Sequence, residues 1–442
     1  MRAVGILAVF ISLPIFISLL RAMPRRRDLA VTAFGALTLA GGSISIDAAL
    51  VSWPLWPGHV RGIIVSLLDI VALALIITRR SPGRIPLLWV YGLYGAVVAL
   101  SILSASVPAA SAFSFFEVVC SALIFYALAG ELLRPSALPA FVRGLSLGLM
   151  VQAAFVIVQK AQGVVQAPGT MVHQNLLGMM VEVTVLIIAA AALEGDRRKV
   201  VLMGLAAGLV VIGGGGSRAA MGLSVLGMII LLILSLARRA TGHKLRITGV
   251  AVLALCVAVP FGLGTLTERF RGASFVTEEA ERAAFERAAR AMSGDYPWGV
   301  GANLYVIIAN KELYSVRAGV APRANNLGAP VHNAYLLQRA ELGWIGQIAF
   351  ILLILWPMAV GFKVAFGNRS STHSGVALAA AVSLFVIALH SGYESAAITP
   401  EMQVIIAACL SVISSVAMKK ARRNTKLVTA PSSALMDRPV II

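Results

Sequence analysis

Residues 331–360 read VHNAYLLQRAELGWIGQIAFILLILWPMAV, and they join a polar loop to an apolar run long enough to cross a bilayer. His332 and Asn333 stand at the junction, and Gly343 and Gly346 follow after nine intervening residues. Glycines at positions i and i+3 of a membrane helix let a second helix approach closely. Because imidazole titrates near neutral pH, this stretch predicts a titratable side chain held where water meets lipid.

The whole chain has the composition of an integral membrane protein. Of its 442 residues, 59% are hydrophobic and 13% charged, and its mean hydropathy is +0.89. The formal net charge of +18 comes largely from short basic clusters between apolar runs, where Lys and Arg set topology and meet anionic headgroups. We therefore expect membrane lipids, and no nucleic acid, as partners. Cys120, Cys256 and Cys409 lie in apolar runs without metal-ligand spacing, which favours a packing role.

Twelve apolar runs come near the roughly 20 residues that a bilayer crossing needs. They are residues 29–46, 62–78, 85–107, 113–130, 144–158, 176–193, 200–213, 219–237, 247–264, 334–360, 375–389 and 403–418. A further run at residues 4–20 has the length of a signal-peptide core, but basic residues and not a small-residue cleavage site follow it, so we expect it to be retained. Whether residues 4–20 cross the membrane or lie in its interface stays open.

Basic clusters after every second run predict the orientation of the chain. They are Arg25–Arg27, Arg79–Arg80, Arg134 with Arg143, Arg197–Lys199, Arg238–Arg239 with Lys244, Lys363 with Arg369, and Lys419–Arg423. The positive-inside rule assigns them to the cytoplasm, and the alternate loops then face the periplasm of a bacterium. The expected fold is all-α and polytopic, with N-terminal membrane helices (1–265), a large periplasmic loop (266–331), C-terminal membrane helices (332–418) and a basic cytoplasmic tail (419–442).

The large loop, about 66 residues long, has room for folded elements of its own. Residues 278–292 are rich in Ala, Glu and Arg and predict a helix that carries Arg282, Phe285 and Ala289 on one stripe. Asp295–Pro297 should end that helix, and Gly299–Gly301 should make a tight connection.

This topology gathers polar residues at one membrane surface, the periplasmic one. They are His173, Gln174, Asn175, Ser217, Arg218, Arg282, His332, Asn333, His390 and Glu394. Arg218 follows Gly213–Gly216 at a helix start, where exposed backbone N–H groups and a guanidinium would form a phosphate cradle. The alternative for each residue is a membrane anchor whose side chain reaches the headgroups.

Two further residues keep alternative interpretations. His332 could simply cap or pack against the start of its helix, and Arg339, on the same helix face, could contact substrate or pair with Glu341 or another acid. The acids Asp69, Glu117 and Glu182 lie in or near spans and should face the protein interior in hydrogen-bonded structural roles. The chain has no nucleotide-binding glycine loop, no Cys or His metal set and no Gly-x-Ser-x-Gly, which favours a reaction without metal or cofactor.

Several motifs in the second half together resemble the O-antigen ligase family. Its His-Asn-x9-Gly-x-x-Gly pattern, shared with the protein O-oligosaccharyltransferases, is similar to His332–Gly346. Four more segments of this chain resemble motifs of the same family: Ser217–Ala219, Arg282 with Phe285, Pro297–Gly301, and Gly169–Thr170 with Asn175. The resemblance implies about twelve transmembrane helices in a lipid-dependent glycosyltransferase (GT-C-like) architecture. It also implies an active site under the large periplasmic loop of a bacterial inner-membrane protein.

The resemblance implies transfer of O-antigen from undecaprenyl diphosphate to lipid A-core, in lipopolysaccharide biosynthesis. His332 would be the base for the acceptor hydroxyl, and Arg218 and Arg282 would hold the diphosphate in place of a metal ion. Direct displacement would invert the anomeric centre. Five residues would orient or bind substrate: Asn333, His173, Asn175, Ser217 and Arg339. The family often has one more Arg in this loop, for which Arg317 and Arg323 are both candidates.

Three other functions remain open. A protein O-oligosaccharyltransferase would use the same donor but usually carries an additional C-terminal domain, whereas this chain ends about 24 residues after its last run. An O-antigen polymerase typically has two sizeable periplasmic loops, and the sequence predicts one. A transporter of lipid-linked sugars would show inverted repeats or paired broken helices, and neither is evident in the sequence. The sugars transferred and the oligomeric state are left undetermined.

Overall fold

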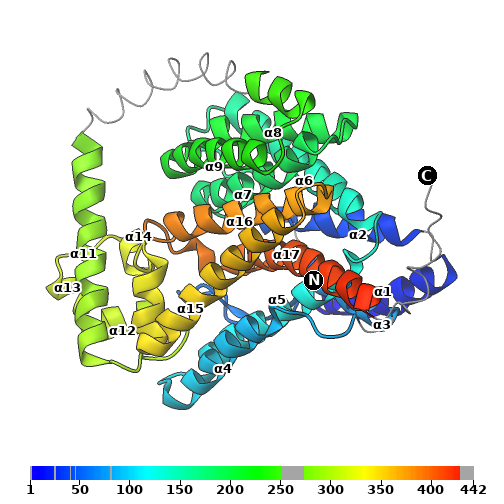
Figure 1. Cartoon of the computed structure of the whole chain (residues 1–442). Coiled ribbons are helices and arrows are strands. Elements are labelled where there is room, and N and C mark those ends of the chain that lie inside the picture. The colour runs from blue at the N-terminus through cyan, green and yellow to red at the C-terminus, as the bar shows by residue number, and fades with distance from the viewer. Residues whose placement is uncertain are drawn as a thin grey trace, which may run out of the picture.

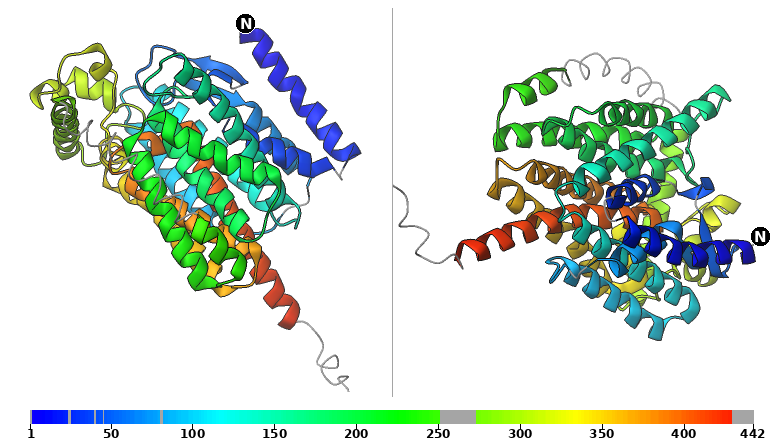
Figure 2. Two further views of the ribbon diagram at one scale, coloured as in Figure 1. Left: turned by 90° about the horizontal axis from the view of Figure 1, so that it is seen from above. Right: turned by 90° about the vertical axis from the view of Figure 1, so that its right-hand side faces the viewer.

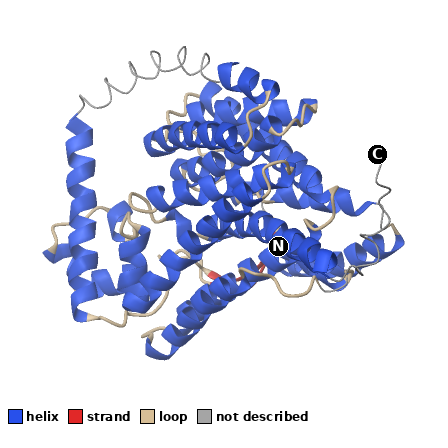
Figure 3. Ribbon diagram, in the orientation of Figure 1, coloured by secondary structure: helices blue, strands red, loops and turns tan. Residues whose placement is uncertain are grey.

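The computed structural model describes residues 2–23, 26–39, 41–44, 46–79, 82–250 and 273–428, and these are almost entirely helical (Figure 3). The first half contains α1 (Arg2–Ala22), α2 (Arg27–Leu37), the 3-10 helix η2 (Gly42–Ile44), β1 (Asp47–Ser52), β2 (Gly62–Ser66), α3 (Leu67–Ile77), α4 (Leu88–Ser104), α5 (Pro108–Glu131), α6 (Ala137–Ala161), α7 (Gln174–Leu193), α8 (Lys199–Gly215) and α9 (Arg218–Arg238). The second half contains α11 (Ala273–Asp295), α12 (Tyr305–Lys311), α13 (Tyr314–Arg317), α14 (Ala324–Leu327), α15 (Ala334–Gly367), α16 (Thr372–His390), the 3-10 helix η3 (Ala396–Ile398) and α17 (Pro400–Val428).

The prediction of an all-α polytopic membrane protein is confirmed. Seven of the described helices are long and apolar enough to span a membrane: α5, α6, α7, α9, α15, α16 and residues Pro400–Arg422 of α17. Shorter apolar helices of 10–17 residues lie within α1, α3, α4 and α8. From residue 251 on, the expected span 247–264 lies outside the described residues, as does Cys256.

Helix α7 is the centre of the membrane part. Its apolar window is 100% buried inside the protein, and it packs against α6, α8, α9 and α16. In Figure 1 it lies between α9 and α16. On the other side of α16, α15 contacts α4 and α17 contacts α5. A helix that is apolar all round is expected in such a fully enclosed position.

A β-hairpin replaces the start of one expected span, residues 62–78. The runs 29–46 and 62–78 contain helices of only 11 residues, α2 and α3. Strand β1 pairs antiparallel with β2, so residues 62–66 are extended and not helical. Gly62–Ser66 contains Ile and Val, whose branched side chains favour strands. Apolar composition alone cannot separate a short strand from a helix start, which is why the sequence pattern missed the hairpin.

Three of the basic clusters predicted to share one membrane side meet at a single buried carboxylate. Arg27 donates to both oxygens of Glu131, at 3.2 and 2.6 Å. Arg134 and Arg79 approach the same carboxylate at 3.1 and 3.8 Å. The side chain of Glu131 is 0% exposed, so these cations offset the cost of taking its charge out of water. The contacts agree with the expectation that the three clusters lie on one side.

The large loop has a small core of its own. Helix α11 spans Ala273–Asp295, and so confirms the helix predicted at 278–292 and its end before Pro297. It packs against α12, α13 and the start of α15, and stands at the edge of the molecule in Figures 1 and 2. Phe285 and Ala289 are buried in this core, as their shared stripe predicted.

A break in α15 holds the loop to the membrane part. Gly343 interrupts the helix with φ 70° and ψ −168°, a combination open essentially to glycine alone. The N–H of Trp344 donates to Pro297 O at 3.4 Å, and the carbonyl oxygens of Ala340 and Glu341 accept from Val300 and Gly301 at 3.1 and 2.8 Å. Backbone groups released by the break are thus satisfied by the loop.

Replacing Gly343 with alanine should destabilise the protein. The new Cβ would lie 2.5 Å from Pro297 O. The alanine would also have to keep the positive φ of Gly343, and this backbone strain costs about 1–3 kcal/mol before the clash is counted. Gly92→Ala in α4 is the matched control, because a Cβ there meets nothing within 4 Å. Thermal unfolding of both variants in detergent measures the difference. Equal stability of the two variants would contradict the role given to Gly343.

Candidate functional site

His332 lies directly before the start of α15, in the position that the sequence predicted. The side chain of Asn333 is the N-cap of that helix and accepts from the N–H of Leu336 at 3.1 Å. The N–H of Ala334 donates to Ser391 O at 2.8 Å, which ties the helix start to the loop after α16. Asn333 therefore caps the helix, and the imidazole of His332 does not take part in the cap.

That imidazole faces a buried carboxylate on the loop after α16. His332 Nδ1 lies 3.0 Å from Glu394 Oε1. The other oxygen of Glu394 accepts from Asn175 Nδ2 at 2.8 Å, and Ser395 N donates to Oε1 at 3.2 Å. An ionised carboxylate only accepts, so Nδ1 carries the proton of this bond, and in neutral His332 the free electron pair is on Nε2.

Glu394 remains ionised at all physiological pH values. Burial by itself would raise the pKa of this carboxyl. The hydrogen bond from His332, its charge when the ring is protonated, the Asn175 amide and the Ser395 N–H together outweigh burial and lower the pKa of Glu394 to about 2. A fixed negative charge beside Nδ1 would stabilise the imidazolium formed when Nε2 takes up a proton.

Helix α11 covers the histidine from the loop side. Phe285 meets the His332 ring edge to face, at 5.8 Å between centroids and 88° between planes. One turn earlier, Arg282 is within 3.5 Å of Tyr393 O, next to Glu394 in sequence. Asn333 Nδ2 lies 3.4 Å from Glu286 Oε1 on the same helix. The structure therefore brings Arg282, Asn333 and His332 together, as predicted.

The start of α7 completes this side of the site. His173 is the N-cap of α7, and its Nδ1 accepts from the N–H of Asn175 at 3.2 Å. Burial lowers the pKa of His173, partly offset by the charge of Glu394, while His332 lowers it further. His173 and Asn175 thus lie close to the pair formed by His332 and Glu394, which fits the orienting role expected of them.

A second His and Glu pair lies beneath the first. His390 Nδ1 is 2.9 Å from Glu182 Oε1, and the two side chains are 1% and 0% exposed. The carbonyl of His390 accepts from the N–H of Glu394 at 3.0 Å. This confirms the structural role predicted for Glu182 and links the core of the membrane part to the Glu394 loop.

The expectation of a glycine-rich loop before Arg218 is wrong. Residues Gly213–Gly215 belong to the last turn of α8, so the connection to α9 is only Gly216, with φ 74°, and Ser217. The start of α9 packs on α7, since a Cβ at Gly178 would lie 3.2 Å from Ser217 Cβ. Arg218 is half-buried at the first position of α9. It lies beside the end of α7 that carries Asn175.

The other arginines differ in their surroundings. Arg339 stacks on Trp344, 3.5 Å from the ring centroid, and so lies against its own helix break. Arg317 turns back to the backbone oxygens of Glu312 and Leu313. Arg323 pairs with Glu281 at 3.3 Å, beside Arg282 in sequence. Of the two loop arginines left open by the sequence, Arg323 is the one that joins α11.

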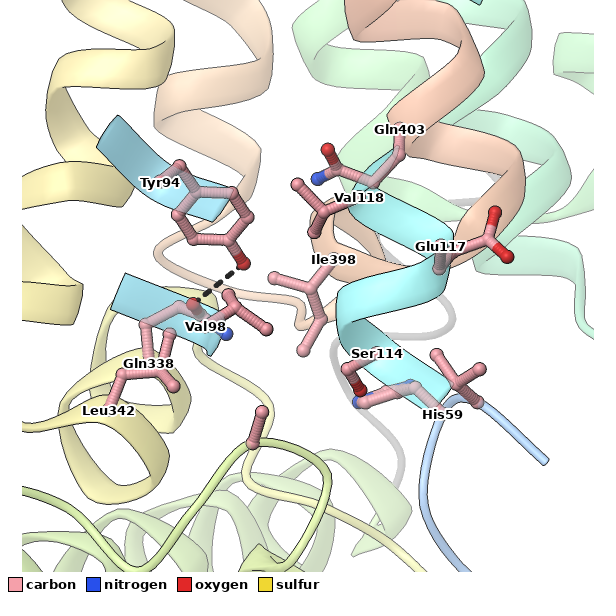
Figure 4. A pocket seen from close by; sticks show the side chains of 12 residues that line it. His59, Tyr94, Val98, Ser114, Glu117, Val118, Gln338, Leu342, Ile398 and Gln403 are labelled. Atoms are coloured by element: carbon pink, nitrogen blue, oxygen red, sulfur yellow. Dashed lines mark hydrogen bonds between the residues drawn. The ribbon is translucent and has the colours of Figure 1, made fainter. Parts of the chain in front are cut away.

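His59 is a member of the site that sequence reasoning did not single out. It comes from the hairpin loop between β1 and β2, and burial lowers its pKa to about 4, so the ring is neutral. It lies within electrostatic range of Glu394 and His332. Figure 4 shows it at a small cavity with Tyr94 and Gln403. One indication of this position was present in the sequence: the loop that contains His59 was predicted to lie on the same side of the membrane as His332.

Glu394 was placed at this surface by the sequence but received no role, because no spacing rule links it to a histidine 62 positions earlier. Among the described residues, no three His, Cys, Asp or Glu side chains are arranged to hold a metal ion. The arrangement can supply a base at His332 Nε2, a charge that stabilises its protonated form, and positive charge from Arg282.

Glu394→Gln should lower thermal stability at pH 7, with a difference from wild type that shrinks in acid. The pKa of Glu394 is lowered on folding, so its stabilising contribution is present above the unfolded value of roughly 4.3 and is lost as pH falls toward about 2. Unfolding in detergent at pH 7 and pH 3 measures this, with exposed Glu279→Gln as the control. A Glu394→Gln deficit as large at pH 3 as at pH 7 would contradict it.

A scan against models of protein families finds no match for this chain, and a search of curated proteins finds no relative. The argument for a function accordingly rests on the motifs in the sequence and on the geometry around His332.

Proposed function

We propose that this protein is an O-antigen ligase: a glycosyltransferase of the bacterial inner membrane that transfers O-antigen from undecaprenyl diphosphate to lipid A-core. The observation that carries the proposal is the pair formed by His332 Nδ1 and Glu394, 3.0 Å apart. It lies at the N-terminal end of α15, among the motifs that resemble this family. The proposal includes about twelve membrane crossings, a GT-C-like architecture and an active site that faces the periplasm.

The reaction would begin at Nε2 of His332. An acceptor sugar hydroxyl attacks the anomeric carbon of the donor, and its proton passes to Nε2. The bond between the anomeric carbon and the diphosphate oxygen breaks, and undecaprenyl diphosphate leaves with the electron pair. Attack opposite the leaving group inverts the anomeric centre. Glu394 stabilises the imidazolium and keeps the ring in the required tautomer, since its carboxylate can only accept from Nδ1.

The leaving diphosphate needs positive charge. Arg282 supplies it from α11, next to the His332 and Glu394 pair. Arg218 supplies it from the start of α9, where the first N–H groups of the helix also favour an anion. Guanidinium groups bind phosphate oxygens in pairs and can replace a metal ion in this role. His173, Asn175 and Asn333 position the base and its carboxylate.

His332→Ala should lower transfer by about 10²- to 10⁴-fold, the usual contribution of a general base, with protein level unchanged. The assay mixes purified protein, undecaprenyl-diphosphate glycan and lipid A-core in the presence of EDTA. His373→Ala, at the opposite end of α16 from His390, is the matched control. Full ligation by His332→Ala would remove the assignment of the base.

Arg218→Ala and Arg282→Ala should each reduce transfer through weaker stabilisation of the leaving diphosphate. Lysine at either position should restore only part of the activity, because an ammonium group lacks the paired donors of guanidinium. Rates for all four variants test this in the same assay. A wild-type product on an added periplasmic protein, with none on lipid A-core, would favour a protein O-oligosaccharyltransferase.

A further inference from the structure

A cavity of about 570 Å³ lies beside the candidate catalytic histidine, beneath the β-hairpin. Its walls come from the hairpin, the starts of α3 and α17, one face of α5, and residues Gly328 and Pro330. Pro330 is two residues before His332, and His59 lines the cavity while lying within electrostatic range of His332 and Glu394. The volume falls within the range of small-molecule sites, about 300–1,000 Å³.

The cavity is lined by carboxylates, in contrast to the arginines proposed for the donor. Asp47, Asp69, Glu117 and Glu401 all line it, and Glu117 lies within electrostatic range of the other three. Arg61 is the cationic side chain in the lining, and His59 is neutral. With one guanidinium in its lining, the cavity lacks the paired cations that a diphosphate needs. The donor's leaving group is better placed at Arg218 and Arg282.

Polar atoms at the cavity lack partners in the protein. The described residues offer no hydrogen bond to the Glu117 carboxylate or to His59 Nε2. An adjoining small cavity shares His59 and Glu117 with the large one, and there Oε1 of Gln403 is also without a partner, although Gln403 is only 2% exposed (Figure 4). The hydrogen-bonded structural role expected of Glu117 is therefore not seen among the described residues.

These unpaired groups indicate a ligand rich in hydroxyl donors. Carboxylate and amide oxygens accept hydrogen bonds, and a buried acceptor without a partner is costly. The same acids are not arranged to hold a metal ion. Aliphatic side chains such as Ile64, Leu176 and Val404 make up much of the remaining lining, and they suit the C–H faces of sugar rings.

We propose that this cavity binds the acceptor, as neutral sugar rings whose hydroxyl groups form hydrogen bonds with the carboxyl group of Glu117. This inference rests on the proposed function and names its acceptor site. It places donor and acceptor on different sides of His332: the anionic leaving group toward α9 and α11, and the neutral sugar beneath the hairpin. In a direct displacement the acceptor hydroxyl and the leaving diphosphate lie on opposite faces of the anomeric carbon, and the base lies beside the hydroxyl.

Steady-state transfer by Glu117→Gln and Ile64→Trp tests the proposal. The first removes a carboxylate without changing shape, and the second fills the cavity from strand β2 without changing charge. Each should raise the KM for lipid A-core about tenfold or more and leave the KM for the donor within twofold of wild type. Exposed Glu279→Gln in α11 should change neither. An unchanged acceptor KM in both cavity variants, with active wild type, would overturn the acceptor site.

Direct binding separates this inference from the proposed function. Core oligosaccharide freed from lipid A is added to wild type and to Ile64→Trp, both eluting as single species in detergent, and saturation-transfer NMR detects binding. Signal from wild type that is lost in Ile64→Trp supports the sugar site even if no transfer is measured. Absence of signal from wild type overturns it even if transfer occurs.

Discussion

The break in α15 at Gly343 is the constraint on which the rest of the site depends. A continuous helix would use the carbonyls of Ala340 and Glu341 for its own next turn. Here they accept from Val300 and Gly301 of the loop, and Trp344 donates to Pro297. The exchange gives these backbone groups partners in an apolar setting. The loop and the helix backbone approach closely at two glycines. A Cβ at Gly299 would lie 2.3 Å from Glu341 O, and a Cβ at Gly343 would lie 2.5 Å from Pro297 O.

The side chain of Glu341 extends this connection. Its Oε1 accepts from the N–H of Tyr305 at 3.1 Å, at the start of α12, where a negative charge is favourable. Tyr305 donates in turn to Phe285 O at 3.3 Å, and Phe285 packs on His332. The position of the imidazole thus follows from the helix break through α12 and α11. The loop and the membrane part form one unit around it.

Buried acids separate into two groups by their partners. Glu131 is bound by arginines, Glu182 pairs with His390, and Glu394 pairs with His332. Each of these charges is compensated within the protein, as burial in an apolar bundle requires. Glu117 has no such partner among the described residues, and it faces a cavity. Glu117 is thus half-buried at a cavity wall, whereas the other three acids are held by cationic or imidazole partners.

The sequence alone determined the membrane class, most helix positions, the helix in the large loop, and the location of His332 and Asn333 at the start of α15. These follow from hydropathy, periodicity and capping, which act over a few neighbouring residues. The hairpin, the helical state of Gly213–Gly215, the cavity, and the meeting of His332 with Glu394 came only from the tertiary structure. Each depends on segments far apart in the chain, and local patterns carry no information about which distant groups will satisfy one another's charges and hydrogen bonds.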